Sequence, residues 1–177
     1  VCNAGISHHG DFAQTRPDVI RRVMAVNFLG AVHCTHAALP ELLARRGMVI
    51  AISSVAGFAP LVGRTGYAAS KHALHGFFDS LRSEVAGAGV AVMLVCPSFI
   101  ATDIDRHALD PQGHPFRGTK AIAGRTATPA EIADRIYEAA RRERRLVLPG
   151  ATARIAWWLS RLAPAGYARI MARRMRR

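Results

Sequence analysis

The chain has 177 residues, half of them hydrophobic, which is enough for one domain with a sizeable core. The formal net charge is +12, but eleven arginines and one acid after residue 139 carry +10 of it, so the basic character belongs to the tail. No run of 18 or more apolar residues is present, so we expect no membrane span. Cys2, Cys34 and Cys96 are far apart and show no paired spacing, which favours inert thiols in a reducing cytoplasm over a disulfide framework.

The first half of the chain reads as loop, long helix and strand. After a polar loop, Pro17 begins a helical pattern that runs to about Arg45 and is expected to kink or lose its last turn at Pro40. Gly47 ends the helix. Residues 48–52 form a short continuous apolar run, which is typical of a buried parallel strand.

The second half repeats the alternation of helix and strand. A helix is predicted from about Thr65 to Ala86, a buried strand from Val90 to Val95, and a helix from Thr128 to Arg142 with a capping box at its start. A last short strand covers residues 146–148, and residues 97–128 form a loop region rich in proline and glycine. This order predicts an α/β fold with a parallel sheet.

Ser54, Tyr67 and Lys71 carry the most informative pattern. The serine lies thirteen residues before the tyrosine and the lysine four after it, so Tyr67 and Lys71 share one helix face. A free tyrosine has a pKa of about 10, and an ammonium group nearby favours the phenolate and lowers that value. A tyrosine tuned in this way can give a proton to a carbonyl oxygen or take one from a hydroxyl. The matching hydride must come from a nicotinamide.

Taken with three further matches in order, these residues give the chain a resemblance to the short-chain dehydrogenase/reductase family over nearly its whole length. Asn3-Ala4-Gly5 resembles the family's turn after the fourth strand, and Asn27 matches the asparagine of the catalytic tetrad that Ser54, Tyr67 and Lys71 complete. Pro97 to Thr102 resembles the Pro-Gly-x-x-x-Thr segment over the nicotinamide, with Ser98 in place of the glycine. The resemblance implies a Rossmann-like doubly wound parallel sheet.

The resemblance also implies roles for individual residues. Ser54 orients the substrate oxygen, Lys71 also contacts the nicotinamide ribose, and the Asn27 side chain holds a water that links Lys71 to solvent. The cofactor is NAD or NADP. The residues implied to contact it are Asn3, Ala4, Gly5, Tyr67, Lys71, Pro97, Ser98, Ile100 and Thr102.

One part of the family pattern is absent from the sequence. The family's glycine-rich turn, which follows its first strand and holds the cofactor pyrophosphate, has no counterpart before Asn3. Three further strands with their helices would need roughly 80 residues. We therefore interpret residues 1–150 as the catalytic part of an incomplete Rossmann-like domain that starts at its fourth strand. An inactive fragment, or a pseudoenzyme serving as a scaffold, stays open beside the enzyme.

Residues 151–177 form a basic amphipathic tail in which apolar residues recur at helical spacing among arginines. Such a tail can lie on an anionic membrane, or it can pack over the substrate pocket or a partner subunit, and the sequence does not decide between these. Arginine alone gives nonspecific attraction to phosphate, and no motif indicates a specific nucleic acid. The eight histidines show no spacing that predicts a metal site.

The sequence thus predicts an NAD(P)-dependent oxidoreductase that interconverts a lipophilic alcohol and a ketone or aldehyde, with Tyr67 as acid and base. The resemblance implies a homo-oligomer, a dimer or tetramer, paired through the long helices after the fourth and fifth strands. The expected location is the cytoplasm, with peripheral contact to a membrane through the tail.

Overall fold

The computed structural model describes residues 1–118 and 126–175 and contains a parallel sheet, so the predicted α/β class is confirmed. The strands β1 (Met48–Ile52), β2 (Ala91–Val95) and β3 (Leu146–Val147) lie in the order β1-β2-β3. Ile50 pairs with Met93 and Leu94 with Leu146. Beside β1, the Cys2 amide donates to the Ile50 carbonyl at 2.8 Å, so the first residues extend the sheet as an isolated bridge.

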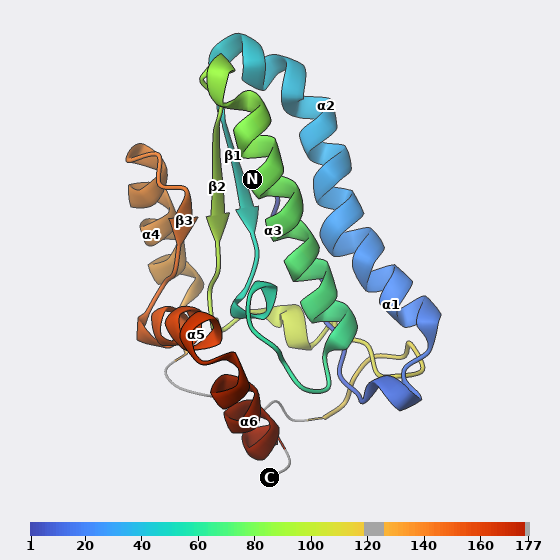
Figure 1. The fold of residues 1–177 in the computed structure, drawn as a ribbon. Coiled ribbons are helices and arrows are strands. Elements are labelled where there is room, and N and C mark those ends of the chain that lie inside the picture. The colour runs from blue at the N-terminus through green and yellow to red at the C-terminus, as the bar shows by residue number, and fades with distance from the viewer. Residues whose placement is uncertain (119–125, 176–177) are drawn as a thin grey trace.

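Helices α1 (Pro17–Met24), α2 (Gly30–Arg45) and α3 (Thr65–Val85) form a layer against the sheet (Figure 1). Phe78 of α3 and Met93 of β2 are fully buried, and Leu74 is 2% exposed. Burial of each such side chain contributes about 1.5–3 kcal/mol. The apolar strand residues and one face of α3 therefore make the main core, as the alternation of strand and helix predicts.

The long N-terminal helix departs from regular α-helical geometry around Asn27. A π-helical turn, η2 (Ala25–Leu29), separates α1 from α2 and holds Asn27 in its middle. Helix α2 continues through Pro40 to Arg45, so the expected loss of its last turn there is wrong. Arg46 takes a left-handed backbone conformation with a φ of 50° and ends the helix. A π turn in a helix commonly marks a functional position.

By length and composition the helical stretch Pro17–Arg45 could cross a membrane. The sequence did not lead us to expect this, because the stretch contains no continuous apolar run of 18 residues. In the fold this stretch belongs to the packed layer: α1 contacts α3, and Val19 and Val23 are buried. Its outer face keeps exposed apolar side chains, among them Leu29 and Leu43. We interpret it as a helix of the core with an outward apolar face.

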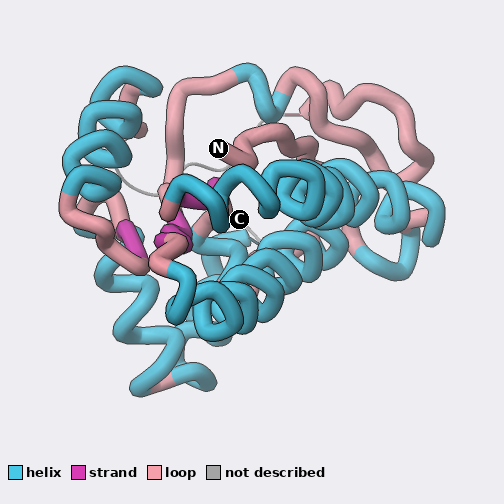
Figure 2. The backbone as a smooth tube through the Cα atoms, turned by 90° about the horizontal axis from the view of Figure 1, so that it is seen from above, coloured by secondary structure: helices cyan, strands magenta, loops and turns pink. Residues whose placement is uncertain are grey.

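Short 3₁₀ turns and loops connect the remaining elements, so much of the molecule outside the helices is irregular (Figure 2). The turns are η1 (Phe12–Gln14), η3 (Val55–Gly57), η4 (Ala86–Ala88) and η5 (Asp103–Asp105). Helix α4 (Pro129–Arg141) starts with the predicted capping box, in which Thr128 and Glu131 exchange two hydrogen bonds. The predicted loop region, residues 97–128, falls partly on residues 119–125, outside the described residues.

Helices α5 (Ala151–Leu162) and α6 (Pro164–Met175) lie beyond the carboxyl ends of β1 and β2 (Figure 1). Ala156 of α5 and Tyr167 of α6 are buried in a small cluster with Ala59 from the loop after η3. The Phe58 and Trp157 rings pack edge to face with their centroids 4.8 Å apart. The tail therefore packs on the segment that follows β1.

Candidate active site

The carboxyl ends of β1 and β2 open into a cavity of about 570 Å³. Ser53 and Ser54 follow β1 directly, Pro97 follows β2, and Tyr67 and Lys71 enter from the first turns of α3. Ligands of open α/β sheets bind at this edge. The structure brings together these predicted residues on the cavity wall: Asn3, Gly5, Ser54, Tyr67, Lys71, Pro97, Ser98, Ile100 and Thr102.

Ser54 and Tyr67 lie on this wall and are hydrogen-bonded to each other. The Ser54 hydroxyl oxygen accepts a hydrogen bond from the Ala56 amide at 3.2 Å, which holds the serine at the start of η3. Burial raises the pKa of the Tyr67 phenol above 10, while the hydrogen bond with Ser54 acts in the opposite direction. The predicted net lowering of the pKa of Tyr67 is therefore wrong for this arrangement, because desolvation of the phenolate outweighs the groups that stabilise it.

Lys71 is 3% exposed and its ammonium group donates to the Ile52 carbonyl at 2.9 Å. Its Nζ atom lies 5.7 Å from the centre of the Tyr67 ring. Burial lowers the pKa of Lys71 to about 8. The lysine is thus held beside the tyrosine by a backbone carbonyl at the end of β1, with two further N–H donors available for other acceptors.

Asn27 lies behind the cavity wall, 1% exposed. Its side-chain oxygen accepts from the Ile6 amide at 2.8 Å, and its amide nitrogen donates to the Ile6 carbonyl and to the Ser70 hydroxyl, each at 2.9 Å. Ser70 in turn donates to the Tyr67 carbonyl at 2.7 Å. The side chain therefore joins the first segment to α3, and the water-holding role stays a prediction.

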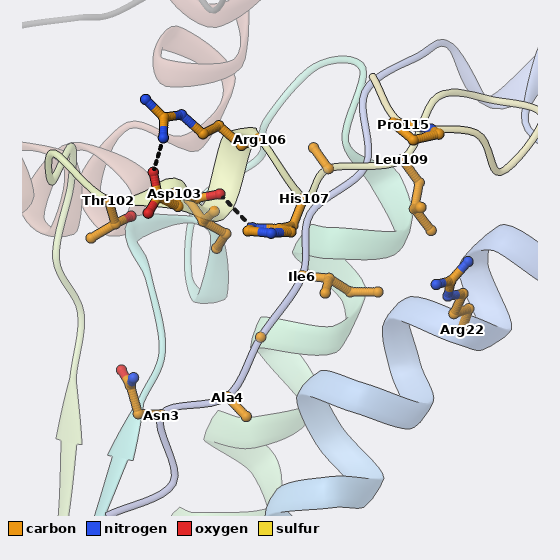
Figure 3. A pocket seen from close by; sticks show the side chains of 13 residues that line it. Asn3, Ala4, Ile6, Arg22, Thr102, Asp103, Arg106, His107, Leu109 and Pro115 are labelled. Carbon is orange, nitrogen blue, oxygen red and sulfur yellow. Dashed lines mark hydrogen bonds and ion pairs between the residues drawn. The ribbon is translucent and has the colours of Figure 1, made fainter. Parts of the chain in front are cut away.

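A second cavity of about 640 Å³ adjoins the first, and Asn3, Gly5, Thr102 and Ile104 line both. Figure 3 shows it between the first segment, α1 and the segment after β2. Ala4 lines this second cavity, with Arg22 and Arg106 as cations. A Cβ atom on Gly5 would lie 3.3 Å from the Asn27 side-chain oxygen, so a larger residue there would crowd the Asn27 amide.

The sequence assigned no role in the site to His75, which contacts the residues that follow β1 and β2. His75 Nε2 lies 3.0 Å from the Ser53 hydroxyl and 3.4 Å from the Cys96 sulfur. Burial raises the pKa of the Cys96 thiol to about 12, so it is an inert group. His75 lies one turn after Lys71 on α3, and this spacing was the available signal.

Residues far along the chain complete the cavity. Ile155, Leu159 and Met171 of the tail helices line it together with Ser54, Tyr67 and Lys71. Of the two interpretations of the tail, packing over the pocket is thus seen directly for its inner face. Within residues 1–118 and 126–175, no three His, Cys, Asp or Glu side chains gather as metal ligands would.

Comparisons with known proteins agree with this geometry. A family model described as short chain dehydrogenase matches residues 1–113. The chain is 41% identical over 176 residues to the Anopheles gambiae dehydrogenase/reductase SDR family protein 7-like, covering 98% of this chain and 56% of that protein. It is 38% identical to the Bos taurus dehydrogenase/reductase SDR family member 7B, covering 99% of this chain and 54% of that protein. The chain therefore belongs to the short-chain dehydrogenase family, and it spans about half the length of the curated relatives it matches.

Solved structures show the same fold. A short-chain dehydrogenase from Burkholderia cenocepacia in complex with NADP matches with a TM-score of 0.79 at 24% identity, over 94% of this chain and 67% of that one. A Burkholderia phymatum enzyme of the family in complex with NAD matches with a TM-score of 0.78 at 21% identity, over 93% and 65%. At these identities the likeness concerns the fold.

The burial of Lys71 predicts a pH-dependent cost in stability. The unfolded chain binds the lysine proton more tightly, so the free energy of unfolding rises as pH increases from about 8 to 10.5. We expect Lys71→Met to be more stable than the wild type at pH 7 by about 1–2 kcal/mol, with the gain fading toward pH 10. Denaturant unfolding at several pH values measures this.

Arg16→Met serves as the control for this experiment, because the Arg16 side chain is 58% exposed and the change should stay within about 0.5 kcal/mol. A Lys71→Met chain that is less stable at pH 7, or whose stability difference does not vary with pH, would contradict the account of the buried ammonium.

Proposed function

We propose that the chain carries the catalytic part of an NAD(P)-dependent oxidoreductase that interconverts an alcohol and a ketone or aldehyde. The observation that carries this proposal is the meeting of Ser54, Tyr67 and Lys71 on the wall of one cavity at the carboxyl edge of the sheet. Membership of the short-chain dehydrogenase family supports it.

Tyr67 is proposed as the proton-transfer group. Because burial raises its pKa, the phenol keeps its proton at neutral pH and can donate it to a carbonyl oxygen in the reduction direction. In the oxidation direction the same oxygen takes the proton of the alcohol. Ser54, which already hydrogen-bonds the phenol, can hold the substrate oxygen beside it.

Lys71 and Asn27 are proposed to support this transfer. With a pKa near 8, Lys71 exchanges its proton in the neutral to mildly basic range and can resupply Tyr67. Asn27 fixes the helix turn that carries Tyr67 through Ser70. The proposed water relay then runs from Lys71 toward the π turn at Asn27.

A nicotinamide cofactor, which supplies the hydride, fits the two adjoining cavities. Pro97, Ser98 and Ile100 would contact its nicotinamide end, and Lys71 has donors for the adjacent ribose. Asn3, Ala4 and Gly5, with Thr102, would line its path into the second cavity, where the Arg22 guanidinium suits phosphate, while Arg106 is paired with Asp103 at 3.1 Å. Structural neighbours bound to NADP and to NAD support the cofactor class and leave the choice open.

A lipophilic substrate is proposed from the lining of the first cavity. The tail helices contribute Ile155, Leu159, Ile170 and Met171 to it, and charged groups are few. Apolar walls with a small number of convergent polar groups are typical of sites for lipophilic small molecules.

Replacement of Tyr67 by phenylalanine tests the proposed chemistry. We expect kcat for reduction of a hydrophobic ketone to fall by about 10²–10⁴-fold, because the phenol that gives the proton is lost. Tyr137→Phe is the matched control, since Tyr137 is 64% exposed on α4. A Tyr67→Phe enzyme with unchanged kcat would contradict the assignment.

The outer face of the tail supports a second proposal, peripheral binding to an anionic membrane. Trp158 is 61% exposed and Leu162 77% exposed on α5, while Arg154, Arg169 and Arg173 lie exposed around them. An apolar row flanked by arginines suits the headgroup region of an anionic bilayer. The row lies on helices that line the cavity, so a lipophilic substrate could enter from the membrane.

We expect the protein to sediment with vesicles that contain phosphatidylserine, and the double variant Trp158→Ser, Leu162→Ser to remain largely in solution. The two substitutions remove exposed apolar area, which is what inserts into the bilayer interface. Tyr137→Ser removes a similar exposed ring outside the tail and should leave sedimentation unchanged. Equal sedimentation of the double variant and the wild type would overturn the membrane proposal.

We also propose a homo-oligomer, a dimer or tetramer, in the cytoplasm. The exposed apolar side chains Leu29 and Leu43 lie on the outer side of the long N-terminal helix, the helix that the family resemblance pairs between subunits. Exposed apolar area of this kind favours association.

A further inference from the structure

Arg64 lies at an electrostatically unfavourable place. It is the residue before α3, one turn ahead of Tyr67, and its side chain is only 11% exposed. A helix N-terminus carries a partial positive charge and so repels a cation, and a buried guanidinium keeps its charge. Stability alone does not explain an arginine here. Arg64 lines the same cavity as Tyr67, which suggests a role in the site.

Two side chains from distant segments hold the Arg64 guanidinium. Its Nη2 atom donates to Nδ1 of His9 at 3.2 Å and lies 3.8 Å from Oδ1 of Asp105 in η5. Burial lowers the pKa of His9 to about 4, so the ring is neutral and carries its proton on Nε2, 3.5 Å from the same Asp105 oxygen. The His9 ring stacks on Phe116 with a centroid distance of 4.2 Å.

Arg64 lines the same cavity as Tyr67, and Ile104, the residue before Asp105, packs against the cluster that contains the Tyr67 ring. Arg64 lowers the pKa of the phenol and Asp105 raises it. Lys71, one turn after Tyr67 on α3, points its ammonium group at the Ile52 carbonyl. His8 is buried with a lowered pKa and is neutral, like His9.

Helix α1 and turn η3 bring no charge to this part of the site. The buried side chains that they pack against Tyr67 are apolar, Val23 and Ala56. The balance of charge at the phenol therefore depends on Arg64, Lys71 and Asp105 among the described residues.

We propose that Arg64 is a positioning residue that stabilises the phenolate form of Tyr67 from the start of α3, and that Asp105 opposes it from the segment after β2. Because the two charges lie on different segments, a displacement of η5 would change the proton affinity of Tyr67. The consequence for catalysis rests on the proposed function of Tyr67. The electrostatic effect itself does not, and it can be measured without an enzyme assay.

The test is an absorbance titration of tyrosinate near 295 nm, with the same background carrying Tyr67→Phe subtracted to isolate Tyr67. We expect Arg64→Gln to raise the midpoint by about one pH unit and Asp105→Asn to lower it by a similar amount. Arg64→Lys keeps the charge and should stay close to the wild type. Arg106→Gln, next to Asp105 but 82% exposed, is the control and should not move the midpoint.

Opposite shifts of the Tyr67 midpoint in Arg64→Gln and Asp105→Asn support the proposal. A purely structural disturbance would not raise the midpoint in one variant and lower it in the other. Shifts in the same direction, or no shift in either, overturn it. If Arg64→Gln does not fold, Asp105→Asn decides alone: a lower midpoint supports the proposal and an unchanged or higher one overturns it. A chain without oxidoreductase activity would still give this result, so failure of the proposed function is recognised separately.

Discussion

The Asn27 side chain is the contact on which the rest of the site depends. Its amide hydrogen-bonds both backbone groups of Ile6 and the hydroxyl of Ser70, and it does so from a π turn inside the long N-terminal helix. Three segments that are distant in sequence thereby take fixed positions. A buried amide with all these partners is costly to disturb, because removal of one group leaves the others unsatisfied in the interior. The position of Tyr67, one hydrogen bond further along, follows from this contact.

The electrostatics of the site follow from burial as much as from pairing. The same desolvation that raises the pKa of Tyr67 lowers that of Lys71, so the two proton affinities move apart and the phenol becomes the group that holds its proton more tightly. A phenol that stays protonated and an amine that readily loses a proton form a suitable pair for passing a proton to substrate. The cavity wall supplied by α5 and α6 helps to maintain this dry environment. The tail is therefore part of the site and not an appendage to it.

Much of the fold was predictable because its signals are local. Apolar runs mark the strands, and the capping box at Thr128 and the spacing of Tyr67 and Lys71 rest on residues close in sequence. Ser54 follows β1, and Pro97 and Thr102 follow β2. Because the carboxyl ends of neighbouring parallel strands lie at one edge of the sheet, these residues line the same cavity. The π turn at Asn27 was not predictable, because it depends on the Ile6 backbone and not on helix propensity.

The unpredicted parts of the site share this dependence on distant segments. Arg64 and His75 recur at helical spacing with Tyr67 and Lys71, so the sequence indicates that the four side chains share one side of α3. It does not indicate their partners, because His9 follows Cys2 and Cys96 follows β2. The direction of the Tyr67 pKa also required the structure, since burial of the ring cannot be read from an i,i+4 pair.

The most direct test of the account is a titration of NADH and NADPH into the 177-residue chain, followed by nicotinamide fluorescence. The account predicts saturable binding that weakens when Thr102 and Ser98 are replaced by bulkier residues on the cavity wall. A folded chain that binds neither nucleotide would contradict the claim that these two cavities form the nicotinamide site.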